Sequence, residues 1–425
     1  MNPILFKQVK ILDPNSSFHK SVCDVLIQDG TITKINKFIK ASPEVIPLHN
    51  NGSILSPGWV DVGTCSGEPG NEHRETWKSL AAAAQKGGYT TLLTFPNNQP
   101  FTHSKTEVQS IVNHTSRLQV SIFPIGALSK DGLAKEMADY LQMYDAGAVA
   151  FSDGSISMQH QGMMLRALEY SKLIPKGLVI NIPEDAMIAG TGQMHEGQIS
   201  TFLGLKGIPE IAEKIMLDRD LSLQEYTGSR LMLHKISTSY STDKIRRAKK
   251  QSDHIFSTVS IFNLLFEDKS LIDFEVNYKF RPPLRDGATL KSLVKGVLDR
   301  SIDIIVSDHT PWDTEKKDLE FQQSAFGSIN LETAYASLRT FGDKVLTDEI
   351  WVECVAIRPR QIFNLPSTSI QINEKADLCW FHPETEWKYT SENIHSKSKN
   401  TPYPGVTFKG KALGIYCKNN FYDNR

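Results

Sequence analysis

Apolar and polar residues alternate with a period of two near both ends of the chain. The alternation covers four stretches, residues 3–13, 22–38, 376–381 and 406–417. Such a pattern around Pro, Asn and Gly turns is typical of short antiparallel strands that bury one face. We therefore predict a small composite β domain that is built from residues 1–54 and 346–425, with a helical or loop segment inside its C-terminal part.

Between residues 55 and 345 the pattern changes to short apolar runs that alternate with longer segments of helical period. The strand-like runs include VSIFPIG, AVAFSD, LVINIPE, RLMLHKIS and IDIIVSD. Repeated strand-helix units imply a parallel sheet, and about eight of them close into a (β/α)8 TIM-type barrel. The sequence thus predicts an α/β fold whose chemistry lies at the carboxyl ends of the barrel strands.

Composition excludes several classes of function. The chain has 425 residues and a formal net charge of -1 at pH 7, so no overall field attracts nucleic acid or an anionic membrane surface. No apolar run approaches the roughly 20 residues of a membrane span. The five cysteines are scattered, without the Cys-x-x-Cys spacing of a zinc or redox site. We expect a cytoplasmic protein with small-molecule or protein partners.

Residues 56–100 predict a buried strand, a Gly-rich loop, a helix over about 75–86 and a second strand. The first strand and its loop contain Pro57, Gly58, Asp61, Glu68, Pro69 and Gly70. At this spacing they resemble the pattern Pro-Gly-x-x-Asp-x-His-x-His-x-Arg-Glu-Pro-Gly of the dihydroorotases, which are cyclic amidohydrolases of the amidohydrolase superfamily. The resemblance extends over nearly the whole chain and implies a barrel with a composite β domain.

The resemblance implies hydrolysis of the cyclic amide of dihydroorotate, or its reverse, at a site with one or two metal ions. The family's metal ligands map to Gly63, Cys65, Asp153, Ile182 and Lys235. Glycine and isoleucine offer no donor atom, and a cysteine binds zinc only as its thiolate. We therefore expect vestigial ligand positions and no metal cofactor.

Other parts of the family's site are kept in this chain. The proton shuttle of the family maps to Asp308, and its substrate contacts map to Asn97, Asn277, Ala325 and Gly327. Gly67 stands where the family has the arginine that binds the substrate carboxylate. A charge-assisted pair of that kind contributes about 1.5–3 kcal/mol, so its loss weakens substrate binding.

Three functions remain open. The first is a catalytically silent dihydroorotase homologue of pyrimidine biosynthesis, which forms homo-oligomers or assembles with aspartate carbamoyltransferase, as inactive members of the family do. The second is an active dihydroorotase or related cyclic amidohydrolase with a zinc site rebuilt from Cys65, Asp153 and Asp308. The third is a module that binds a pyrimidine-like small molecule.

The charges at the barrel mouth give a specific geometric prediction. Lys235 takes the position of a lost metal ligand, and strand alternation then directs its side chain into the barrel and His234 toward the helices. Without a dication, Asp153 and Asp308 would face and repel each other. We therefore predict an ammonium-carboxylate contact within about 4 Å between Lys235 and one of these aspartates.

Overall fold

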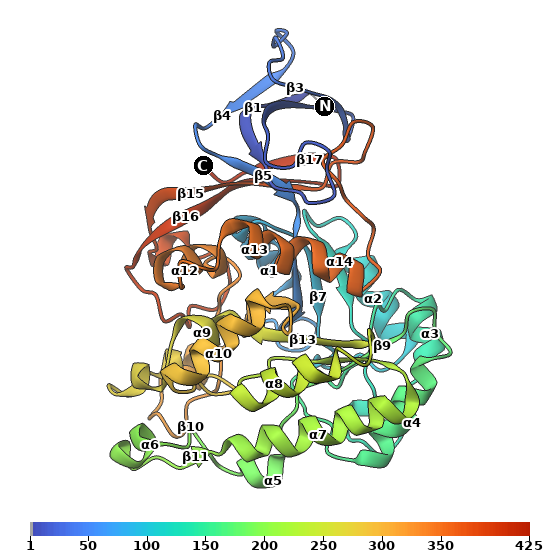
Figure 1. The fold of residues 1–425 in the computed structure, drawn as a ribbon, viewed down its shortest axis with the longest axis vertical. Helices are drawn as coiled ribbons and strands as arrows, with labels where there is room; N and C mark the ends of the chain where they lie inside the picture. The colour runs from blue at the N-terminus through green and yellow to red at the C-terminus, as the bar shows by residue number, and fades with distance from the viewer. Residues whose placement is uncertain (1–2) are drawn as a thin grey trace.

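The computed structural model describes residues 3–425, and the alternating segments at the two ends of the chain pair there in one sheet. The eight strands of this sheet are β1 (Ile4–Ile11), β2 (Val22–Gln28), β3 (Thr31–Asn36), β4 (Ile46–His49), β5 (Ile54–Pro57), β15 (Leu378–Lys388), β16 (Thr407–Cys417) and β17 (Asn420–Asp423). Their order is β17-β16-β15-β5-β1-β2-β3, with β4 paired to β1. Strands from both parts of the chain share this sheet (Figure 1), so a β domain formed by N- and C-terminal segments is confirmed, and its exact bounds stay a prediction.

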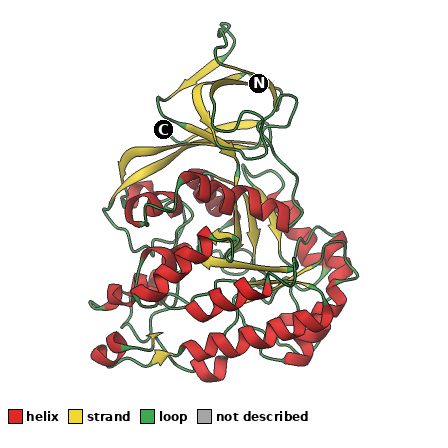
Figure 2. Cartoon of the chain, in the orientation of Figure 1, coloured by secondary structure: helices red, strands yellow, loops and turns green. Residues whose placement is uncertain are grey.

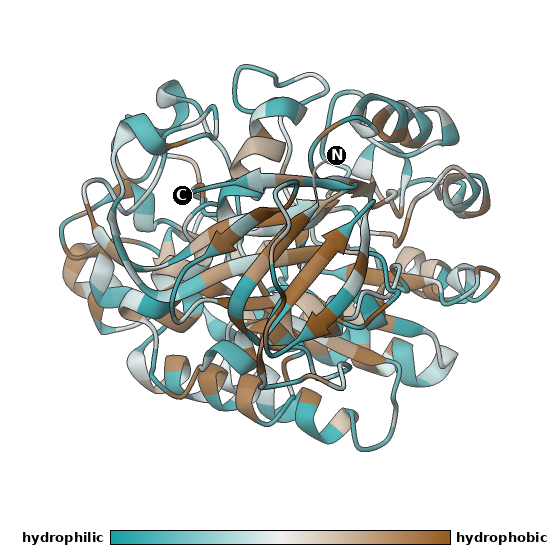
Figure 3. Ribbon diagram, turned by 90° about the horizontal axis from the view of Figure 1, so that it is seen from above, coloured by the Kyte–Doolittle hydropathy of each residue, from teal (hydrophilic) through white to brown (hydrophobic). Residues whose placement is uncertain are grey.

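β5 joins the two halves of the sheet. It pairs antiparallel with β15 and parallel with β1, so the sheet continues from the N-terminal to the C-terminal strands through β5. The alternation of β1 buries Phe6, whose ring meets Trp380 of β15 edge to face at 5.7 Å between centroids. In the view from above, apolar segments run through the middle of the sheet and hydrophilic loops surround them (Figure 3).

The barrel strands form two parallel ladders. One ladder contains β6 (Trp59–Thr64), β7 (Tyr89–Thr94) and β8 (Ser121–Pro124), and the other contains β9 (Leu178–Asn181), β12 (Arg230–Leu233), β13 (Ile255–Ser260) and β14 (Ile304–Val306). Between β8 and β9 the fourth strand of the barrel is represented by one residue, Phe151. It forms isolated β-bridges with Gly126 on one side and Val179 on the other. β14 lies against β6 and closes the ring. The predicted (β/α)8 barrel is confirmed.

Closure of the barrel depends on Asp61, which is fully buried on β6. Its Oδ1 atom accepts a hydrogen bond of 2.7 Å from the Ser307 amide, and its Oδ2 atom accepts one of 2.8 Å from the Ser307 hydroxyl. Ser307 directly follows β14, so these bonds connect the last strand to the first.

Helices surround the barrel strands (Figure 2). They are α1 (Trp77–Gly87), α2 (Lys105–Thr115), α3 (Tyr140–Asp145), α4 (Gln161–Ser171), α5 (Ala186–Ala189), α6 (Gln198–Leu203), α7 (Glu210–Thr227), α8 (Ser239–Ala248), α9 (Ile261–Leu265), α10 (Gly287–Leu298), α11 (Thr314–Lys317), α12 (Ala334–Phe341), α13 (Asp348–Val352) and α14 (Arg358–Ile362). A π-helical turn, Glu353–Ile357, joins α13 to α14 and contacts β6 and β14. A short ladder of β10 (Met194–His195) and β11 (Gly207–Ile208) lies outside the barrel. No helix within residues 3–425 is both long enough and apolar enough to cross a membrane.

The helix expected over 75–86 forms as α1, over Trp77–Gly87. Thr76 caps its first turn, and Ser79 returns a side-chain bond to the Thr76 amide, which satisfies two amides that the helix leaves free. Gly88 ends the helix in the left-handed conformation, with φ of 91°. A Cβ atom at Gly88 would lie 2.8 Å from the Trp59 ring, so the sharp entry into β7 requires glycine.

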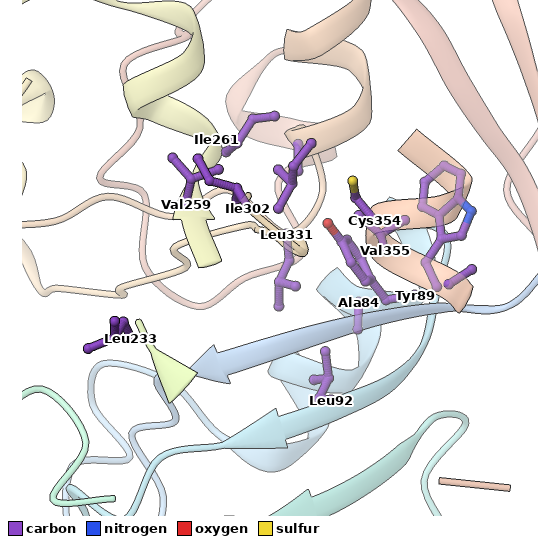
Figure 4. Close-up of a cluster of buried hydrophobic side chains, with 14 of the residues drawn as sticks. Ala84, Tyr89, Leu92, Leu233, Val259, Ile261, Ile302, Leu331, Cys354 and Val355 are labelled. Atoms are coloured by element: carbon purple, nitrogen blue, oxygen red, sulfur yellow. The ribbon is translucent and has the colours of Figure 1, made fainter. Parts of the chain in front are cut away.

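Two apolar clusters lie on opposite sides of the barrel strands. The outer cluster packs strands against helices, and Figure 4 shows Leu92, Leu233 and Val259 of three strands together with Ala84 and Val355. The inner cluster fills the barrel with residues that include Val60, Leu93, Ile180, Met232 and Ile304. On β12, the neighbouring residues Met232 and Leu233 therefore face the inner and outer clusters respectively.

Candidate functional site

A cavity of about 430 Å³ lies at the carboxyl ends of the barrel strands. It is lined by Gly63, Cys65, Ser66, Arg74, Phe95, Asn97, Asn98, Ser155, Ile156, Ser157, Gln159, Ile182, Glu184, Ala186, Lys235, Arg281, Asp308, Thr310, Trp312, Phe326 and Gly327. Most of the site residues expected from the sequence are in this list. Asp153, Asn277 and Ala325 are not.

An ion pair occupies the centre of the mouth. The Nζ atom of Lys235 lies 2.7 Å from Oδ1 of Asp308, and the two side chains are 12% and 8% exposed. Nζ also donates to the Arg281 carbonyl at 2.9 Å, while Oδ2 of Asp308 accepts from the Ser260 hydroxyl at 2.9 Å. The predicted ammonium-carboxylate contact is confirmed, with Asp308 as the partner.

The backbone at both members of this pair is left-handed, with φ of 54° at Lys235 and 57° at Asp308. β12 ends at Leu233, so the extended alternation no longer applies at Lys235. His234 still follows Met232 toward the inside of the barrel, and the left-handed turn then brings Lys235 to the mouth as well. The prediction that His234 points toward the helices is therefore wrong.

His234 fills the space next to Gly63. Its ring packs edge to face against Phe95 at 5.1 Å between centroids, and Nδ1 lies 2.9 Å from the Thr258 hydroxyl. Burial, followed by the charge of Lys235, lowers the pKa of His234 well below its usual value, so the ring is neutral. Its Nε2 atom lies 2.8 Å from the point where a Cβ at Gly63 would be, so there is no room for a larger side chain at 63.

Asp153 does not face Asp308, which corrects the expected like-charge arrangement. Its Oδ1 atom accepts from the amides of Leu128 and Ser129 at 2.8 and 2.9 Å, and Oδ2 accepts from the Ser129 hydroxyl at 2.7 Å. Burial raises the pKa of Asp153, and these hydrogen bonds act in the opposite direction. Because the loop after β8 binds the whole carboxylate, Asp153 has a structural role.

The expected substrate contacts are only partly brought together. Asn97 lines the cavity, but its amide is bound at both ends, to the Asp153 carbonyl at 3.0 Å and to the Ser155 amide at 2.8 Å. Asn277 lies in a single turn, Val276–Tyr278, outside the cavity. The Ala325 carbonyl accepts from Lys317 at 2.9 Å, and of this loop only Phe326 and Gly327 reach the cavity. Asn277 and Ala325 thus do not line this cavity, and their role as substrate contacts stays a prediction.

Sequence reasoning missed the basic residues of the cavity wall. The Arg74 guanidinium lies 3.7 Å from the Trp312 ring centroid, and its Nε atom donates to the Pro311 carbonyl at 2.9 Å. Arg281 pairs with Glu184, with 2.7 Å between Nε and Oε1. The members of each pair lie far apart in the sequence, and no motif brings Arg74 to Trp312 or Arg281 to Glu184.

Comparison with known proteins agrees with the fold and the strand-end motifs. A family model described as dihydro-orotase-like matches residues 52–241. A dihydroorotase of Syntrophus aciditrophicus is 34% identical over 413 residues, which is 96% of each chain. A dihydroorotase of Bacillus subtilis is 33% identical over 412 residues, 96% of this chain and 95% of the relative. The chain belongs to the dihydroorotase family.

A solved structure shows the same fold at lower identity. The L-hydantoinase (dihydropyrimidinase) from Arthrobacter aurescens superimposes with a TM-score of 0.85 over 99% of this chain and 96% of that chain, at 20% sequence identity. The fold of this dihydroorotase-family chain is thus the barrel with a β domain that the cyclic amidohydrolases share.

The dihydroorotase family implies a metal, and the residues at this mouth do not fit one. Within residues 3–425, no three His, Cys, Asp or Glu side chains converge on a point where they could hold an ion. Asp153 is bound by the loop after β8, and Lys235 neutralises Asp308. Burial raises the pKa of Cys65 and disfavours the thiolate that a metal would need. The zinc site expected from Cys65, Asp153 and Asp308 is therefore not formed by this geometry.

Proposed function

We propose that this member of the dihydroorotase family is catalytically silent and serves pyrimidine biosynthesis as a cytoplasmic assembly partner. The ion pair of Lys235 with Asp308 carries the proposal. Hydrolysis of a cyclic amide needs a nucleophile, and a metal supplies it by lowering the pKa of bound water to about 7. An ammonium group at a ligand position repels a dication and cannot coordinate water in this way.

The proton shuttle of the reaction is engaged as well. A general base must accept a proton from the attacking water, and it needs a free oxygen within hydrogen-bond reach. Oδ1 of Asp308 accepts from Lys235, and Oδ2 accepts from Ser260. The ion pair of Lys235 and Asp308 therefore leaves this part of the site without a metal-activated water and without a free general base.

We propose aspartate carbamoyltransferase as the protein partner, beside self-association of the chain. The support is the resemblance to inactive family members that assemble with this enzyme, together with a complete barrel and β domain around a mouth that does not fit a metal. Met187 on α5 and Ile211 and Ile215 on α7 are 90%, 50% and 44% exposed, and the two helices are in contact. Exposed apolar side chains on neighbouring helices are suited to protein contact.

The test of silence measures dihydroorotate hydrolysis by the purified protein with and without added zinc. We expect no turnover above a metal-free control, while an active dihydroorotase assayed beside it responds to zinc. Turnover well above the control would overturn the proposal in favour of an active cyclic amidohydrolase.

The test of assembly is co-elution of the purified chain with purified aspartate carbamoyltransferase in size-exclusion chromatography. We expect a shared peak for the unmodified chain, and separate peaks for Ile211→Lys combined with Ile215→Lys. An exposed control, Leu173→Lys on the segment after α4, should keep the shared peak. Separate elution of the unmodified chain at micromolar concentration would reject this partner.

A further inference from the structure

We propose that the mouth cavity binds a small organic monocarboxylate, and that Arg74 is the residue that binds its carboxylate. The inference rests on the proposed function, because it treats the cavity as a binding site without a reaction. It assigns the anion contact to the loop after β6, at a residue seven positions beyond Gly67.

The charges that line the cavity leave one cation without a partner. Lys235 pairs with Asp308, and Arg281 pairs with Glu184. No acidic side chain of the described chain lies within ion-pair distance of Arg74. The cavity lining thus has three cationic side chains and two carboxylates, a net charge of one positive unit. A monoanion would neutralise this charge, whereas a dianion would leave a net negative charge.

The guanidinium of Arg74 is also held in place before any ligand binds. Its face lies 3.7 Å from the Trp312 ring centroid, and its Nε atom is bound to the Pro311 carbonyl. The two terminal nitrogens make no hydrogen bond to any residue of the range 3–425. Arg74 is partly buried, and this burial lowers the pKa of its guanidinium. The two terminal nitrogens of this planar guanidinium can donate together to the two oxygens of a carboxylate.

Two further donors line the same cavity. Asn98 is 3% exposed, its Oδ1 atom accepts from the Ser66 hydroxyl at 3.0 Å, and its Nδ2 atom has no partner within the described residues. Whichever way the amide is turned, one polar atom of Asn98 remains unpaired. The Lys235 ammonium has three protons, of which Asp308 and the Arg281 carbonyl use two. Acceptor atoms on a ligand would give these donors partners.

The size and the apolar wall of the cavity define the rest of the ligand. Phe95, Ile182 and Phe326 contribute apolar surface, and about 430 Å³ is in the range of small-molecule sites. A flat ring or short chain that carries one carboxylate and a few acceptor atoms matches this combination.

The experiment is isothermal titration calorimetry with two probes that differ only in the carboxylate, dihydroorotate and dihydrouracil. We expect the unmodified protein to bind dihydroorotate at least about tenfold more tightly than dihydrouracil. Arg74→Gln should weaken dihydroorotate binding by about 10-fold to 100-fold and leave dihydrouracil binding unchanged. Arg117→Gln removes an exposed cation outside the cavity and should change neither.

Several outcomes would overturn the inference. A flat titration of the unmodified protein with dihydroorotate would do so, as would equal losses for both probes in Arg74→Gln. Competition by inorganic phosphate as strong as by dihydroorotate would show a general anion site instead. If Arg74→Gln does not fold, Arg74→Lys is the second variant, because it keeps the charge without the planar guanidinium. It should weaken dihydroorotate binding by a smaller factor and leave dihydrouracil binding unchanged. Product formation is followed in the same samples, because turnover would refute silence without refuting the role of Arg74.

Discussion

The ammonium nitrogen of Lys235 lies 2.7 Å from Oδ1 of Asp308, across the barrel mouth from β12 to β14. Each residue follows the end of its strand in a left-handed backbone conformation, which non-glycine residues adopt at a cost. The turns direct both side chains into the cavity at the barrel mouth. The Lys235 ammonium thus neutralises the charge of Asp308 without an ion.

Removal of the Lys235 ammonium should destabilise the fold. Lys235→Ala leaves the carboxylate of Asp308 with a single hydrogen bond, from Ser260, in a largely buried place. We expect the free energy of unfolding in urea to fall by roughly 3–5 kcal/mol, because one buried charge loses its partner. The exposed Lys250→Ala should change it by no more than about 0.5 kcal/mol.

A double variant separates lost charge from lost packing. Lys235→Ala combined with Asp308→Asn removes both charges, and it should recover most of the stability that Lys235→Ala loses. If the double variant is as unstable as the single one, the ion pair is not the cause of the loss.

Restoring a histidine at Gly63 should fail to restore a metal site. A Cβ at this position would lie 2.7 Å from the Phe95 ring and 2.8 Å from His234, and φ is 78°. We expect Gly63→His to destabilise the protein by at least about 2 kcal/mol through overpacking and left-handed strain. Thermal and urea unfolding measure this loss.

Gly405 provides a control for the cost of a left-handed backbone without side-chain crowding. Its φ is 75°, and a Cβ there would have no atom within 4 Å. Gly405→His should therefore cost only the left-handed strain, about 1 kcal/mol. Equal losses at the two glycines would contradict the crowding between Gly63, Phe95 and His234.

Acid should destabilise the protein through His195. Burial, followed by the charge of Arg285, lowers the pKa of His195 from 6.5 to about 4. Between these values the unfolded chain holds the proton and the folded chain does not, so stability is present above pH 6.5 and is lost as the pH falls toward 4. The loss is about 3 kcal/mol.

The measurement compares urea unfolding of the unmodified protein and His195→Gln across this pH range. The difference in free energy between them should shrink as the pH falls, because only the unmodified protein carries the penalty of His195. His114→Gln, at an exposed position of α2, is the control for removal of an imidazole. A constant difference for His195→Gln would refute the role of this ring.

The fold was predictable because hydrophobic residues recur along the sequence with simple periods. Alternation in the terminal stretches follows from a sheet with one buried face. The second half of β1 and the first half of β16 show it, whereas the rest of each strand is buried. The apolar runs of the barrel strands follow from burial on both faces. The reduction of the fourth strand to Phe151 was not predictable, since pairing over one residue leaves no period in the sequence.

The site was predictable only where charge decides the arrangement. A carboxylate without its dication needs a cation, and this argument found the contact between Lys235 and Asp308. It failed for Asp153, because amides of a distant loop replace a cation there. It failed for His234 because alternation was extended past the end of β12. Arg74 was missed because the loop that carries it has no periodic pattern.

Elemental analysis shows directly whether the barrel mouth, with the Lys235 ammonium beside Asp308, binds a metal. The purified protein is incubated with zinc, freed of unbound ion by gel filtration and analysed for metal, with an active dihydroorotase treated in the same way. We expect a zinc content at the background level for this chain, while the active enzyme retains its metal. Zinc retained in stoichiometric amount, and lost in Asp308→Asn, would contradict this expectation.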